Sequence, residues 1–182
     1  IAGNPNDLRT TDALAVGFSF DGTGVSGDAP TNTLYDGYYN GRQYPVAETD
    51  GVADTNVIGN EVDMFSVGNG ESPDAPRDWD GRVAEIFTYE RVLTDAEHQR
   101  VNAYLALKYG ITLDNTDNNA GIEEGDYVLS DGTTVVWDGD IAGTNAAYHN
   151  AVTGIVRDDN QALIQSKSAS QSPDGIVTIQ AI

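Results

Sequence analysis

The 182-residue chain contains no cysteine. A disulfide framework, a thiolate metal site and a cysteine nucleophile are therefore all excluded. The absence does not fix the compartment, because exported proteins can be stiffened by bound metal ions instead of disulfides.

Positive charge is scarce: nine lysines and arginines stand against 29 aspartates and glutamates, for a formal net charge of -20. The basic residues are scattered, so nothing offsets the repulsion of a phosphate backbone or of an anionic membrane surface. No apolar run approaches the roughly 20 residues that span a bilayer. We therefore expect neither nucleic-acid binding nor membrane insertion.

Catalytic motifs are also missing. The two histidines, His98 and His149, lie far apart in the sequence, and no Gly-x-Ser-x-Gly elbow accompanies them. Neither a P-loop nor a Gly-x-Gly-x-x-Gly turn between a strand and a helix is present. The sequence favours a protein that is not an enzyme.

What the chain has in excess is carboxylate. Residues 28–80 hold eleven acids against Arg42 and Arg77, and residues 114–140 hold eight acids and no base. Such density is tolerated either as a solvated acidic coat or because calcium ions, which prefer six to eight oxygen ligands, neutralise it. The candidate calcium ligands lie in three loops: Asp74, Asp78 and Asp80; Asp114, Asp117 and Asn119; Asp138 and Asp140.

Hydrophobic periodicity predicts mainly β structure. Residues 14–20 alternate apolar and polar, and residues 34–44 read as a hairpin whose Asn40-Gly41 supplies the positive φ angles of a tight turn. Further candidate strands lie at 62–68, 82–89, 127–130, 133–137, 153–156 and 176–179.

One helix is predicted over residues 95–109. Thr94-Asp95-Ala96-Glu97 forms a capping box, and apolar residues recur at helical spacing as far as Gly110, which can end the helix in the left-handed conformation.

The stretch from Trp79 through Glu85 and Thr94 to Ile111 resembles the C-terminal end of concanavalin A-like, laminin-G-like jelly-roll domains, in which a glycine-led strand feeds a helix. The resemblance spans roughly residues 34–112 and implies a jelly-roll β-sandwich over residues 1–113. Residues 114–182 form a second small β unit that looks like the β region following such jelly rolls in large secreted bacterial adhesins and gliding-surface proteins. The resemblance therefore implies secretion to a bacterial cell surface.

A complete jelly roll has several strands before position 13, where this chain has a dozen residues. Since an incomplete sandwich exposes open edges, we expect another segment of the same large protein, or a second chain, to complete it, or the chain to be a fragment. The second β unit likewise looks truncated at Ile182.

These observations predict an extracellular module that binds a surface glycan or peptide with the help of calcium. The candidate ligand-binding residues are the aromatic and acidic side chains Trp79, Asp78, Asp80, Tyr38 and Tyr39. One alternative is a structural spacer in a giant surface fibre. Another is a jelly-roll glycan hydrolase or its accessory domain, but for hydrolysis the paired Glu61 and Asp63 lack the second Glu that would act as acid/base.

Overall fold

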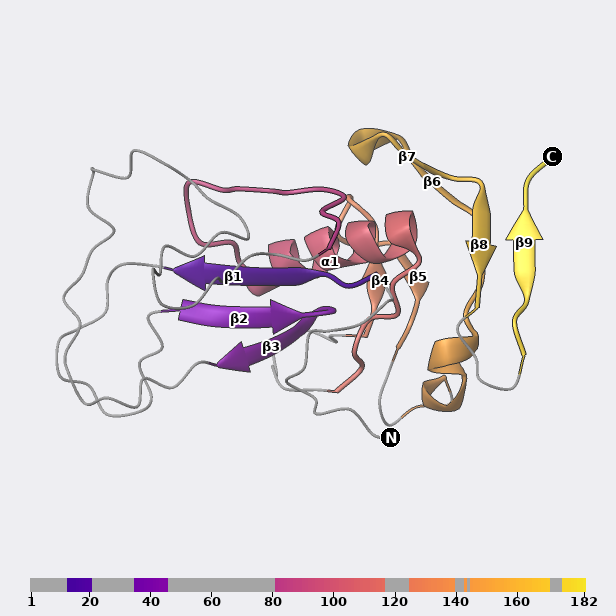
Figure 1. Ribbon diagram of the computed structural model, residues 1–182, viewed down its shortest axis with the longest axis horizontal. Coiled ribbons are helices and arrows are strands. Elements are labelled where there is room, and N and C mark those ends of the chain that lie inside the picture. The colour runs from indigo at the N-terminus through magenta and orange to yellow at the C-terminus, as the bar shows by residue number, and fades with distance from the viewer. Residues whose placement is uncertain are drawn as a thin grey trace, which may run out of the picture. The chain divides into compact units, whose positions relative to one another are not determined.

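The computed structural model describes residues 13–20, 35–45, 81–116, 125–139, 143, 145–170 and 175–182 (Figure 1). Within these ranges the protein is mainly β, with small sheets and one α-helix, as the sequence predicts. The predicted strand at 62–68 lies outside the described residues.

The chain divides into two compact units, each made of segments that are not consecutive in the sequence. The first contains Ile1–Ser19, Tyr35–Val46 and Leu93–Ile182, and the second contains Phe20–Leu34 and Ala47–Val92. The expected boundary between residues 113 and 114 falls inside the first unit. The division into modules 1–113 and 114–182 stays a prediction.

The predicted hairpin is confirmed. In the three-stranded sheet β1-β2-β3, β2 (Tyr35–Tyr39) lies between β1 (Val16–Phe20) and β3 (Arg42–Pro45), and β2 and β3 pair antiparallel (Figure 1). Asn40 at φ 46° and Gly41 at φ 90° close the turn. These left-handed angles suit the right-handed twist of the two strands.

The predicted helix is confirmed at both ends. α1 spans Asp95–Tyr109; the Thr94 hydroxyl accepts the Glu97 N–H while a Glu97 carboxylate oxygen accepts the Thr94 N–H at 2.9 Å. Gly110 ends the helix at φ 69°. Ala103 and Ala106 are its buried residues, and side chains this small let the neighbouring strand β4 approach the helix closely.

The C-terminal half is built from antiparallel pairs of very short strands. β4 (Tyr127–Val128) pairs with β5 (Val135–Trp137), β6 (Val156–Asp158) with β7 (Leu163–Gln165), and β8 (Lys167–Ala169) with β9 (Thr178–Gln180). The 3-10 turns η1 (Ala146–Ala151) and η2 (Asp159–Gln161) interrupt them. The expected strand at 153–156 begins only at Val156.

Residues 82–89, expected as a strand, form none in the structure. They are mostly exposed and are not paired in any sheet of the described residues. A strand needs a ladder partner, and alternating apolar residues alone do not supply one. The expectation was therefore wrong for these residues.

The core is small. It gathers Ala15, Ala106, Ile111, Leu113 and Tyr127, with Leu105, Leu107, Tyr109 and Trp137 packed against it. Leu113 is the largest fully buried side chain of the described residues. In the described part of the chain, side-chain hydrogen bonds act together with this core in holding the segments together.

Two glycines allow backbone segments to touch. A Cβ atom on Gly139 would overlap the carbonyl group of Gly125, and one on Gly125 would lie 2.6 Å from the Cβ of Asn115. The approach is fixed by bonds from the Gly139 N–H to Asp126 Oδ1 at 2.8 Å and from Asn115 Nδ2 to the Gly139 carbonyl at 3.4 Å.

We expect Gly139→Ala to lower the free energy of unfolding by about 1–3 kcal/mol, because the two backbones must separate to admit a methyl group. Gly154→Ala is the matched control, since a Cβ there meets no atom within 4 Å. Its effect should stay within about 0.5 kcal/mol. Equal losses in urea unfolding of the two variants would contradict the steric interpretation.

Asp158 ties the β4–β5 hairpin to β6. Asp158 as a residue is 7% exposed, and its carboxylate accepts the Ser130 N–H at 2.8 Å, the Ser130 hydroxyl at 2.7 Å and the Asn160 N–H at 3.2 Å. These hydrogen bonds, first of all the one from the Ser130 N–H, hold the pKa of Asp158 below its ordinary value, although burial acts in the opposite direction.

A lowered folded-state pKa means that the ionised carboxylate stabilises the fold above the unfolded value of about 3.9, and that this stabilisation is lost as the pH falls through the folded-state pKa. We expect Asp158→Asn to cost about 1 kcal/mol at pH 7 and the difference from wild type to narrow below about pH 4. Urea unfolding across pH measures this. Asp159→Asn is the control, because its side chain is 69% exposed; a difference for Asp158→Asn that does not change with pH would refute the assignment.

Candidate functional site

The segment Ile111–Asp114, which follows α1, takes its hydrogen bonds largely from side chains rather than from a neighbouring strand. The Ile111 N–H donates to the Ala106 carbonyl at 3.0 Å, which closes the helix end, and the Asp114 N–H donates to the Asn40 carbonyl at 2.7 Å. Tyr127 and His149 satisfy three further polar groups of this segment, the Ile111 carbonyl and both the N–H and the carbonyl of Leu113. Buried backbone needs such partners, because an orphaned group costs free energy.

Tyr127 serves this backbone twice. Its hydroxyl accepts the Leu113 N–H at 3.1 Å and donates to the Ile111 carbonyl at 3.2 Å. Burial raises the pKa of Tyr127 above its ordinary value, against the smaller opposite effect of the Leu113 N–H. The phenol therefore keeps the proton that it donates to Ile111.

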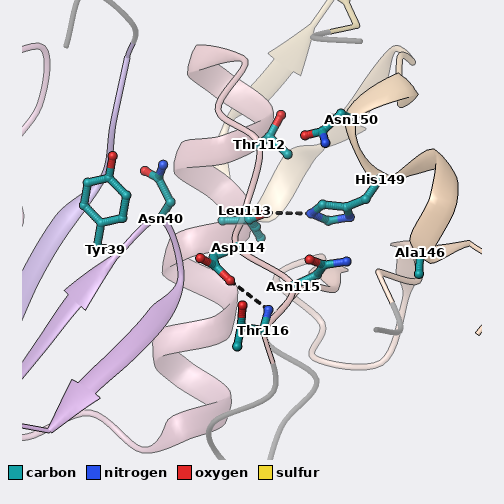
Figure 2. A pocket seen from close by; sticks show the side chains of 10 residues that line it. All are labelled: Tyr39, Asn40, Thr112, Leu113, Asp114, Asn115, Thr116, Ala146, His149 and Asn150. Carbon is teal, nitrogen blue, oxygen red and sulfur yellow. Dashed lines mark hydrogen bonds between the residues drawn. The ribbon is translucent and has the colours of Figure 1, made fainter. Parts of the chain in front are cut away.

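His149 completes the arrangement from η1. The ring is 5% exposed, its Nδ1 accepts the Trp137 Nε1–H at 3.2 Å, and its Nε2 lies 2.5 Å from the Leu113 carbonyl oxygen (Figure 2). Because Nδ1 accepts a hydrogen bond, the proton sits on Nε2, which donates to Leu113. Both ring nitrogens are thus occupied by hydrogen bonds.

The β2–β3 turn is fixed on the other side of the segment. Asn40 exchanges bonds with Ala15: the Ala15 N–H donates to the Asn40 side-chain oxygen at 2.9 Å, and the Asn40 N–H donates to the Ala15 carbonyl at 2.8 Å. With the bond from Asp114, Asn40 joins β1, the turn and the segment after the helix.

These fixed segments surround a surface hollow of about 340 Å³ (Figure 2). Its lining comes from the β2–β3 turn, the segment after α1 and η1: Tyr39, Asn40, Thr112, Leu113, Asp114, Asn115, Thr116, Ala146, His149 and Asn150. Most of these side chains are polar and uncharged, and Tyr39 is aromatic. The Tyr39 hydroxyl and the Asn150 amide have no hydrogen-bond partner among the described residues, so they are available to a ligand.

Among the described residues, Asp114 is the one carboxylate in this lining. It accepts the Thr116 N–H at 2.7 Å, and Arg42 Nη1 lies 3.8 Å from its second oxygen. Within the described ranges, no three His, Cys, Asp or Glu side chains gather as a metal site would require.

The predicted site residues fall into two groups. The following lie outside the described residues: Trp79, Asp78, Asp80, Asp74, Asp117, Asn119 and Asp140. Of the rest, Tyr39 and Asp114 line the hollow, Asp138 does not, and Tyr38 is buried and stacked on His98 with ring centroids 4.1 Å apart. Calcium binding and the loop around Trp79 stay predictions.

Sequence reasoning missed His149, Asn150 and Asn115 as parts of one site. A lone histidine in a polar segment resembles any surface residue, and its role here depends on Trp137 and Leu113, which are 12 and 36 positions away. No local spacing rule encodes contacts of this kind.

Comparison with known proteins gives one finding. Residues 97–182, just under half of the chain, are similar to a family described as a domain of unknown function, DUF8202. No curated protein and no solved structure matches the chain. The matched range begins inside α1 and includes Leu113, Tyr127, Trp137 and His149, so the helix and the network around it belong to the similar region.

One further finding concerns membranes. No helix among the described residues is long and apolar enough to cross a bilayer.

We expect His149→Phe to lower the free energy of unfolding by about 2–3 kcal/mol, because the buried Leu113 carbonyl and the Trp137 N–H would both lose their partner. His149→Gln, which can still donate to Leu113, should lose less. Thermal and urea unfolding measure the effect. Tyr148→Phe is the control at the neighbouring position, where the side chain is 61% exposed; a loss there as large as for His149→Phe would contradict this role.

Proposed function

We propose that the chain is a non-catalytic binding module of a large bacterial surface protein, secreted to the cell surface, and that its hollow holds a neutral polar ligand, either a glycan unit or a peptide segment. The observation that carries the proposal is the hollow of about 340 Å³ with its uncharged polar lining. That volume lies at the lower end of the range of small-molecule sites, which suits a mono- or disaccharide or a few peptide residues.

The composition of the lining supports a neutral ligand. A sugar offers hydroxyl groups that both donate and accept, and amides and hydroxyls such as those of Asn150 and Thr116 can match them. Tyr39 offers the aromatic ring against which a sugar or peptide face packs. In a chain of net charge -20, an anionic ligand would be repelled, whereas the Asp114 carboxylate in the hollow is partly offset by Arg42.

The same lining supports binding rather than chemistry. Hydrolysis of a glycoside needs two carboxyl groups about 5–10 Å apart, and among the described lining residues Asp114 is the single carboxylate. His149 cannot serve as a base while both nitrogens are bonded to Leu113 and Trp137.

The finer parts of the proposal rest on the resemblance. We propose a concanavalin A-like jelly-roll sandwich for the N-terminal region and a calcium site formed by acidic loops such as the one around Asp78 and Asp80. The dense carboxylates of residues 28–80 support calcium, since they need neutralisation.

The test is an array of neutral glycans and peptides, probed with and without calcium, with hits measured by calorimetry. Tyr39→Ala and Asn150→Ala should each weaken binding about tenfold, as expected when one stacking or hydrogen-bonding contact is lost. Tyr89→Ala, an exposed tyrosine outside the hollow, is the control.

Binding that survives both variants would show that the ligand does not use the hollow. An array without a single hit would favour the structural spacer. Hits that vanish in EDTA while the fold persists would support the calcium-assisted form of the proposal.

A further inference from the structure

The strand β9 and its flanks carry an apolar edge that contrasts with the rest of this acidic chain. Residues 176–182 read Ile-Val-Thr-Ile-Gln-Ala-Ile, without a charge or a proline, and all of them are exposed. Ile176 is 75% exposed and Val177 is 56% exposed. Uncharged segments of high β propensity at a sheet edge are the ones that recruit another strand.

The pairing with β8 fixes which edge of β9 is open. β8 and β9 lie side by side (Figure 1). Ser168 lies opposite Ile179, the Ser170 N–H donates to the Val177 carbonyl and the Ala181 N–H donates to the Ser166 carbonyl. Residues 177, 179 and 181 therefore direct their backbone groups toward β8. By the alternation of an antiparallel ladder, Thr178 and Gln180 direct theirs to the opposite side. No described strand pairs with β9 on that side.

Of the two edges of the β8–β9 hairpin, the β9 edge is the better suited to pair with another strand. β8 and its flanks read Ser-Lys-Ser-Ala-Ser over residues 166–170, with low β propensity and an exposed lysine. A lysine on an edge strand is a common protection against edge-to-edge pairing. β9 lacks any such protection.

The open edge matches itself. An antiparallel pairing centred on Ile179 places like beside like across a two-fold axis: Ile176 with Ile182, Val177 with Ala181, Thr178 with Gln180, and Ile179 with Ile179 of the second copy. In this register the outward backbone groups of Thr178 in one copy form hydrogen bonds with those of Gln180 in the other copy. We propose that β9 is a self-association edge, through which a second copy of this chain pairs to form a closed dimer with a continuous sheet β8-β9-β9-β8.

The net charge of the chain predicts how dimerisation depends on ionic strength. Two chains of net charge -20 repel, so the uncharged edge must act against a general repulsion. Salt screens that repulsion, and the dimer should strengthen as the ionic strength rises. Because one pair of short strands buries little area compared with a standard interface, we expect weak association.

The first experiment is sedimentation analysis of the 182-residue chain from about 10 µM to about 1 mM, where small interfaces associate. Ile179→Lys and Ile179→Glu should each weaken the dimer at least about tenfold, since residue 179 faces its own copy and like charges would meet. An equimolar mixture of the two variants should restore it. Ile164→Lys, at a 72% exposed isoleucine of β7, should leave it unchanged.

A cross-link tests the register without relying on the charged variants. The chain has no cysteine, so Ile179→Cys introduces a single thiol. At a non-hydrogen-bonded pair the two Cα atoms lie about 4.5 Å apart, within disulfide reach. Mild oxidation should link this variant into dimers far faster than it links Ile164→Cys.

Several outcomes would overturn the inference: a monomer throughout the concentration range, a dimer weakened by salt, no rescue in the Lys and Glu mixture, or faster cross-linking of Ile164→Cys. Circular dichroism and thermal unfolding verify that each variant is folded. Glycan or peptide binding at the hollow is independent of these results.

Discussion

The peptide groups around Leu113 are the constraint on which the described structure depends. Leu113 is buried and lies just beyond the end of α1. Its N–H and carbonyl are therefore outside the hydrogen bonds of the helix and need other partners. Tyr127 satisfies the N–H and His149 satisfies the carbonyl, from segments that follow in the sequence. A polar backbone inside a small core is thereby held by two aromatic side chains in place of a β-strand.

This constraint accounts for how the small strand pairs are held together. Two-stranded ladders of two or three residues are marginal by themselves. Tyr127 begins β4, and Trp137 ends β5 and donates to His149, so the hairpin and η1 are both bonded to the segment after α1. The close contact of Gly125 and Gly139 lets that hairpin close at its open end. Asp158 performs the corresponding task for β6 through Ser130.

What the sequence could predict was local. Thr94, Glu97 and Gly110 satisfy or end a helix through contacts within a few residues, and Asn40-Gly41 encodes its own turn, so both were readable from spacing. Residues 82–89 show the limit, because their alternation resembles a strand but a ladder depends on a distant partner. The hollow was out of reach for the same reason: Tyr39, Asn115 and Asn150 meet only through bonds that Asn40, Gly139 and His149 make across the fold.

The hydrogen bonds around Leu113 and the lining of the hollow involve the same residues. Leu113 and His149 line the hollow while their mutual hydrogen bond holds the core, and Asn40 lines it while joining β1 to the segment after the helix. The walls are therefore set by bonds that folding already requires, so under the proposed binding function a ligand would not have to order them. Such preorganisation lowers the entropic cost of binding. It also separates two roles among neighbouring residues: the hydrogen bonds of His149 and Leu113 shape the hollow, whereas the Tyr39 hydroxyl and the Asn150 amide, which have no partner among the described residues, are the groups that the proposed binding function would use.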